Sequence, residues 1–172
     1  MMWSAAIFVL VYAALFAMLE IEIEGPHGWA ERLPTVPVVG KFTGYHCVMN
    51  VMVVFTLLYA LLPALGAWAT LFFVVGWFLI EDFVWFVLNP SFGICNYTRD
   101  KVKWHGPYWP FGIPLHNFIG LAVMLFAAIM AGNALQLLLA GAIMAAGVVA
   151  IVFAAPSYMK LYASVRAGKN KV

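Results

Sequence analysis

Glu81 and Asp82 stand side by side within an apolar stretch that runs from 67 to 88. At about 1.5 Å per residue, they lie ~10 Å from the end of that stretch if it is helical. A charged side chain near a bilayer centre costs ~2.5–3.5 kcal/mol on insertion scales, so such acids are functional-site hypotheses by default. Neighbouring residues point about 100° apart on a helix, so at least one acid is expected to face the protein interior. Glu81 and Asp82 are therefore the predicted catalytic residues.

Further carboxylates and imidazoles are expected at a similar depth on three other helices. Glu20 and Glu24 are four residues apart and share a face if the first apolar stretch continues as a helix. His46 and His116 stand near the starts of the second and fourth stretches. Carboxylates and imidazoles directed into a bundle core are how di-metal carboxylate sites are built, and they suit iron, zinc or copper. The sequence thus predicts a divalent metal (Fe, Zn or Cu) as cofactor, with Glu20, Glu24, His46, Glu81 and His116 as its ligands.

The glutamate-rich run of residues 20–24 has a second interpretation. In an extended segment its three glutamates would share one side, where a cation or the basic Arg32 and Lys41 would separate their charges. Glu24 and His27 have the Glu-x-x-His spacing of di-iron helices, but the intervening Gly-Pro is expected to break the helix. His105 lies in the long loop after residue 89, and this loop could fold it over the site.

Composition indicates the elements that position these residues. The chain has 172 residues, of which 66% are hydrophobic and 9% charged, whereas soluble domains have about 45–50% apolar and about 25% charged residues. This excludes an ordinary soluble domain and a disordered chain. Apolar stretches of near span length, without period-2 alternation, predict transmembrane helices rather than strands. The predicted fold is an all-α polytopic membrane bundle, a single integral membrane domain over 1–172, with five spans at about 3–19, 45–62, 67–88, 114–131 and 134–155.

The placement of charge predicts the orientation of the bundle. Two connections, at 62–66 and 131–134, are tight and uncharged, whereas the two long connections and the C-terminal tail would share one face. That face carries all the basic residues: Arg32, Lys41, Arg99, Lys101, Lys103, Lys160, Arg166, Lys169 and Lys171. Because cytoplasmic loops collect Lys and Arg, we expect the N-terminus outside, the C-terminus inside and the polar site near the cytoplasmic side.

Three functions fit these patterns. The first is a metal-dependent enzyme that acts on a lipid-soluble, isoprenoid-like substrate. The second is a metal-free acid–base isomerase, cyclase or hydratase of an isoprenoid or sterol-like lipid, in which Glu81 or Asp82 donates a proton. The third is a non-catalytic small membrane subunit or ion-handling component. Membrane lipid is the expected partner, and the slight basic excess, confined to loops and tail, is no argument for nucleic acid.

Overall fold

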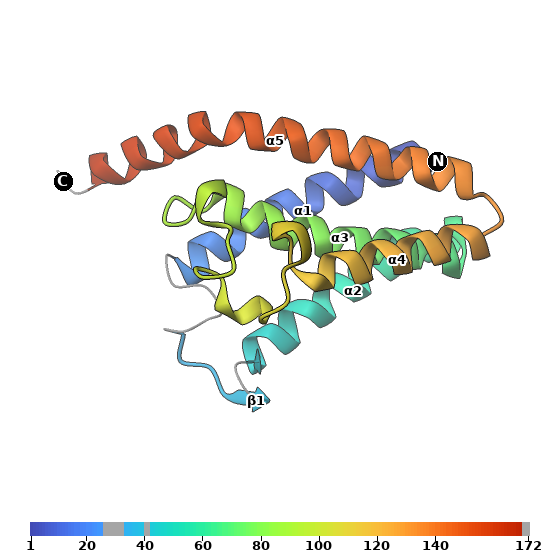
Figure 1. The fold of residues 1–172 in the computed structure, drawn as a ribbon, viewed down its shortest axis with the longest axis horizontal. Coiled ribbons are helices and arrows are strands. Elements are labelled where there is room, and N and C mark those ends of the chain that lie inside the picture. Colours follow the sequence, from blue (N-terminus) through green and yellow to red (C-terminus); the bar gives the residue numbers. More distant parts are fainter. Residues whose placement is uncertain (26–32, 40–41, 170–172) are drawn as a thin grey trace.

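A computed structural model of the protein shows a bundle of five helices (Figure 1). It describes residues 1–25, 33–39 and 42–169, with side chains up to 166. The helices are α1 (Met2–Glu24), α2 (Gly44–Leu65), α3 (Ala67–Leu88), α4 (Leu115–Met130) and α5 (Ala134–Lys169). A short antiparallel pair, β1 (Pro37–Val39) and β2 (Phe42–Thr43), precedes α2. Three short 3-10 turns, at Ile94–Asn96, Lys103–His105 and Pro110–Gly112, shape the long loop between α3 and α4. The predicted all-α architecture is confirmed.

Four of the five predicted spans have the length and composition to cross a membrane: α1, α2, α3 and α5. These helices indicate a polytopic membrane protein. Helix α4 is apolar but has only 16 residues, below the ~20 that a hydrocarbon core requires. The predicted N-out orientation stays a prediction.

Three helices extend beyond their predicted ends, the shortest extension being that of α2 through Pro63 to Leu65. Helix α1 continues through the glutamate-rich run to Glu24, so the interpretation of that run as an extended segment is wrong. The helix ends at Gly25, whose φ of 66° is a left-handed conformation that glycine adopts without strain. Helix α5 continues through Pro156, where the sequence predicts an end. The segment after Pro156 stays helical because it packs on the bundle, with Tyr158 against the apolar core.

Helix α3 is the centre of the bundle and contacts each of the other four helices. Its largest fully buried side chains are Phe72, Phe73, Trp77 and Phe86. Helix α1 approaches it closely through small buried residues: Ala5, Ala6, Ala13 and Ala17. In lipid, small residues at a helix interface strengthen association by letting backbones come close together. Acids on α3 are therefore held inside the protein.

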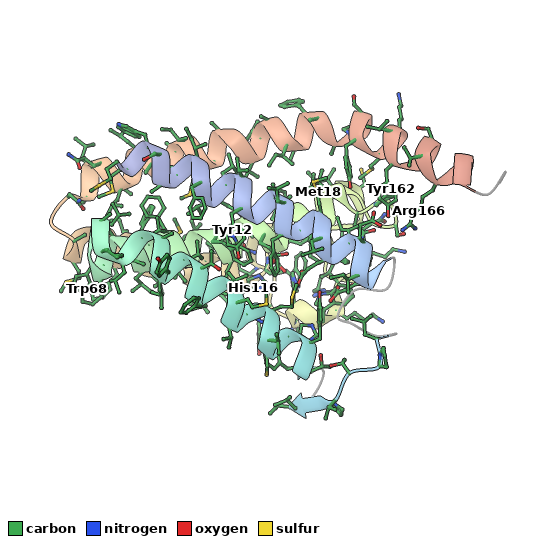
Figure 2. The ribbon with its side chains drawn as sticks, turned by 180° about the vertical axis from the view of Figure 1, so that it is seen from behind. Tyr12, Met18, Trp68, His116, Tyr162 and Arg166 are labelled. Atoms are coloured by element: carbon green, nitrogen blue, oxygen red, sulfur yellow. The ribbon has the colours of Figure 1, made fainter. Side chains whose placement is uncertain are left out.

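The long connections gather at one end of the bundle and the tight turns at the other (Figure 1). Figure 2 shows Trp68 at the end with the tight turns, and Tyr162 and Arg166 near the opposite end. His116 lies between these ends. This arrangement places the loop residues around the open end of the helices that carry the acids.

Candidate metal centre

A pocket of about 410 Å³ lies between α1, α2, α3 and the start of α4, under the long loop. Its polar lining consists of Glu20, Glu24, His46, Asn50, Glu81, Asp82, His105 and His116, and its apolar lining of Phe78, Leu79, Trp85, Phe86 and Trp104. Every residue that the sequence predicts as a ligand or as catalytic therefore lines the same pocket. Their individual roles stay predictions.

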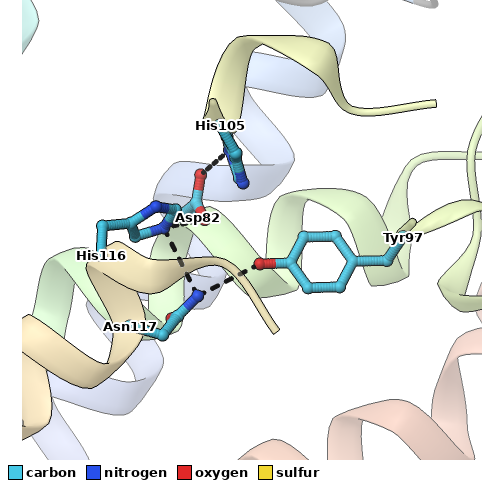
Figure 3. A network of polar contacts seen from close by, with 5 residues as sticks. All are labelled: Asp82, Tyr97, His105, His116 and Asn117. Carbon is cyan, nitrogen blue, oxygen red and sulfur yellow. Dashed lines mark hydrogen bonds and ion pairs between the residues drawn. The ribbon is translucent and has the colours of Figure 1, made fainter. Parts of the chain in front are cut away.

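Asp82 lies between two imidazoles and contacts each with a different oxygen (Figure 3). Its Oδ1 is 3.1 Å from Nε2 of His105, and its Oδ2 is 3.5 Å from Nε2 of His116. Each residue offers one ligand atom such that all three atoms lie within 4.8 Å of one another. A metal bound at about 2.0–2.2 Å holds neighbouring ligand atoms roughly 3–3.5 Å apart. This Asp/His/His triad could therefore hold a metal ion with little movement.

The triad comes from three elements that meet at one depth. Asp82 is six residues before the end of α3, or about 9 Å along the helix axis. His116 lies in the first turn of α4, and His105 ends the 3-10 turn Lys103–His105. The loop must therefore fold back along α3 by that distance to bring His105 to Asp82. The contact between His116 or His46 and one of the two acids, expected from the sequence, is present as the Asp82–His116 pair.

Aromatic packing fixes His105 in place, leaving its side chain only 5% exposed. Its ring is stacked on Trp109 at 6.1 Å, meets Phe86 edge-on at 5.3 Å and lies 4.7 Å from the ring of His116. The indole N–H of Trp109 in turn donates to the carbonyl of Gly106 at 3.0 Å. A buried, immobile imidazole loses little conformational freedom on binding a ligand, which favours a preorganised site.

Asn117 and Tyr97 form the outer layer of the triad. The Asn117 amide nitrogen donates to the Tyr97 hydroxyl at 3.4 Å and lies 3.4 Å from Nε2 of His116 (Figure 3). Burial, and then the negative charge of Asp82, raise the pKa of the Tyr97 hydroxyl. Tyr97 is therefore a neutral hydroxyl around physiological pH, and it anchors the amide that borders His116.

Glu81 points away from Asp82 and meets α1. Its carboxyl group is within hydrogen-bonding distance of that of Glu20. Its Oε1 is shielded from solvent and has no hydrogen-bond partner among the described residues. Two neighbouring carboxylates repel each other, and a shared proton or a bound cation would relieve that repulsion.

The three glutamates at the end of α1 divide between two faces. Glu20 and Glu24 line the pocket, as their spacing predicts, whereas Glu22 is exposed and lies 3.5 Å from Arg166 of α5. The expected pairing of these glutamates with Arg32 and Lys41 falls outside the described residues. So does the Glu-x-x-His partner His27.

His46 has a structural role that its sequence position does not reveal. Its Nδ1 accepts the backbone N–H of Thr43 at 3.2 Å and lies 2.9 Å from the Thr43 hydroxyl, which completes a capping box at the start of α2. An imidazole that accepts at Nδ1 carries its hydrogen on Nε2 when neutral. A metal could bind Nε2 only if this capping contact were given up, and the ligand role of His46 stays a prediction.

The triad differs in membership from the ligand set predicted from the sequence. The two sets share only His116, because the sequence assigns Asp82 to acid–base chemistry and leaves His105 as a loop residue above the site. The one available signal for His105 was its place in an aromatic loop segment, Trp104-His105 and Trp109. Comparison with known protein families, curated proteins and solved structures finds no match for this chain.

Proposed function

We propose that this protein is a metal-dependent membrane enzyme that acts on a lipid-soluble substrate. The observation that carries the proposal is the Asp82/His105/His116 triad, whose ligand atoms all lie within 4.8 Å of one another, close to the spacing of one coordination sphere. Two histidines and one carboxylate with open positions are typical of non-haem iron(II), and catalytic zinc likewise has three protein ligands. The metal is therefore iron(II) or zinc rather than a hard cation such as magnesium.

The pocket supplies what such a metal needs for chemistry. A divalent metal can turn bound water into a nucleophile near neutral pH or polarise a substrate oxygen. Trp85, Phe86 and Phe78 give the same pocket an apolar wall that suits an isoprenoid-like or sterol-like chain. The Glu20–Glu81 pair, which lines the same pocket, would act as the acid–base group for this substrate. The basic residues of the loops and tail support a site on the cytoplasmic side.

A second function is favoured by the contact between Glu20 and Glu81. One proton shared by two carboxyl groups beside the aromatic Trp85 is suited to protonating an alkene, because aromatic faces stabilise a cation. In that case the protein is a metal-free isomerase or cyclase, and the triad is an ion-paired network that holds the loop.

Incubation of the reconstituted protein with lipid separates these functions. The protein in lipid nanodiscs would be supplied with Fe²⁺ or Zn²⁺ and a total membrane lipid extract, and products would be followed by mass spectrometry. We expect a metal-dependent change in one lipid class, abolished by Asp82→Asn. Asp100→Asn is the matched control, because the Asp100 side chain is 90% exposed and lies in the loop that carries His105. Turnover that survives chelation and Asp82→Asn but fails in Glu81→Gln would favour the acid–base function instead.

A further inference from the structure

The segment from Pro107 to Pro114, between the triad's two histidines, presents large apolar side chains outward. Tyr108 is 71% exposed, Phe111 96% and Ile113 44%. The phenyl ring of Phe111 lies 6.4 Å from that of Phe118, on α4. This apolar surface continues onto the outer face of α4, where Leu115 and Ile119 are exposed.

The depth of this segment follows from the triad. His105 and His116 flank it, and both contact Asp82, which lies about 9 Å inside the end of α3. Figure 1 shows the chain that leads into α4 lying beside α3 rather than beyond its end. Helix α4 spans only about 24 Å, so this segment occupies the level that a further turn of α4 would otherwise fill.

Part of the backbone of the segment is satisfied without water, although the amides of Tyr108, Trp109 and Phe111 have no backbone acceptor among the described residues. Pro107, Pro110 and Pro114 have no N–H to satisfy. The amides of Gly112, Ile113 and Leu115 donate to carbonyls within the segment, namely those of Trp109, Pro110 and Tyr108, at 3.2, 3.1 and 3.0 Å. Irregular backbone exposed to lipid does not occur in the hydrocarbon region, so this pairing favours a position of the segment at the edge of the leaflet, with only its side chains reaching the acyl chains.

Phe111 is the one non-glycine residue with positive φ in the described part of the chain, at 53°. A bulky residue in the left-handed region is a strained outlier, and such strain persists at sites where it has a function. The strain here is accompanied by near-complete exposure of the ring, which no packing inside the protein explains.

We propose that residues 107–114 form a loop embedded in the lipid leaflet, with Phe111 inserted among the acyl chains. The partner is the hydrocarbon of the bilayer, because the loop surface is apolar, lies at the depth of Asp82 and is continuous with the outer face of α4. The loop thereby ties both histidines of the triad to the membrane. The embedding does not depend on a metal or on catalysis.

Site-directed spin labelling measures this depth directly. In a Cys47→Ser/Cys95→Ser background, a nitroxide would be attached at Phe111→Cys in lipid nanodiscs, and collision rates with oxygen and with a water-soluble nickel chelate would be compared. Ile119→Cys on the outer face of α4 is the lipid control, and Asp100→Cys in the same long connection is the aqueous control.

We expect the oxygen-to-nickel collision ratio at Phe111→Cys to match Ile119→Cys and to exceed that at Asp100→Cys. Tyr108→Cys, on the same loop, gives a second label position should Phe111→Cys fail to fold. A ratio equal to that of Asp100→Cys would overturn the proposal, as would a label shielded from both reagents, which would indicate a protein partner. If the protein binds no metal but the collision ratio at Phe111→Cys still matches that at Ile119→Cys, the proposed function fails and the embedding of the loop stands.

Discussion

His105 Nε2 lies 3.1 Å from Oδ1 of Asp82, although a long loop separates the two residues in the sequence. The contact joins the loop to the central helix at a point where the His105 side chain is almost fully buried. His116 then approaches the other oxygen of the same carboxylate. One carboxylate thereby brings two imidazoles together, as a metal ion bound by all three would. Without a metal, hydrogen bonds from the imidazoles to Asp82 hold this arrangement.

Asn117→Ala should weaken metal binding without removing it. The amide borders His116 and bonds Tyr97, so its loss leaves the ligand present but less well oriented. Changes of this kind beside a metal ligand typically cost about 10–100-fold in metal affinity. Competition with a calibrated chelator would measure the affinity. Asn133→Ala, in the tight turn before α5, is the matched amide control and should leave the affinity unchanged.

Tyr97 makes the fold sensitive to alkaline pH. Because burial and Asp82 raise the pKa of its hydroxyl in the folded state, folding favours the protonated form. The resulting stability is complete below the unfolded pKa of about 10 and is lost as pH rises through the folded pKa. We expect the melting temperature of the wild type to fall relative to Tyr97→Phe above about pH 10. A constant difference from pH 8 to 11 would show that the hydroxyl ionises alike in both states.

Gly120→Ala should displace Leu79, a residue of the pocket wall. A Cβ at Gly120 would lie 2.7 and 2.9 Å from the two methyl carbons of Leu79, which lines the pocket. Overpacking of this kind costs typically about 1–3 kcal/mol. We expect a lower melting temperature with unchanged metal content, and recovery in the double variant Gly120→Ala/Leu79→Ala. If the single variant melts like wild type, Leu79 has room to move that the structure does not show.

The Glu22–Arg166 pair should contribute little to stability. Both side chains are more than half exposed, at 55% and 56%, and their charged atoms are 3.5 Å apart. Exposed pairs of this kind are worth about 0.2–1 kcal/mol. A double-mutant cycle with Glu22→Ala and Arg166→Ala, followed by chemical unfolding, measures the coupling directly. A coupling well above that range would mean that the end of α5 is held to α1 more firmly than two solvated side chains allow.

The cost of burying charge in lipid made part of the site predictable from the sequence. That cost places Glu81 and Asp82 inside the bundle, and helical spacing places Glu20 and Glu24 on one face. The position of His105 was not predictable in the same way, because it depends on how the long loop packs its aromatic side chains on α3. The capping role of His46 depends on Thr43 and on the turn before α2, which periodicity does not reveal.

The predicted end of α5 is wrong because a proline in the sequence does not reveal how the helix packs in the folded protein. Pro156 disfavours a helix by its own chemistry, yet α5 continues past it, and Tyr158 packs against the apolar core. The fourth predicted span, about 114–131, agrees with α4 (Leu115–Met130) to one residue at each end.

The metal content of the purified protein tests the central claim most directly. The protein would be loaded with Fe²⁺ or Zn²⁺ in detergent, freed of excess metal by gel filtration and analysed by elemental mass spectrometry beside His105→Ala, Asp82→Asn and Asp100→Asn. The triad predicts close to one ion per chain in the wild type and in Asp100→Asn, and near-complete loss in the other two variants. Equal metal content in all four folded proteins, or none in any of them, would contradict a metal centre at Asp82, His105 and His116.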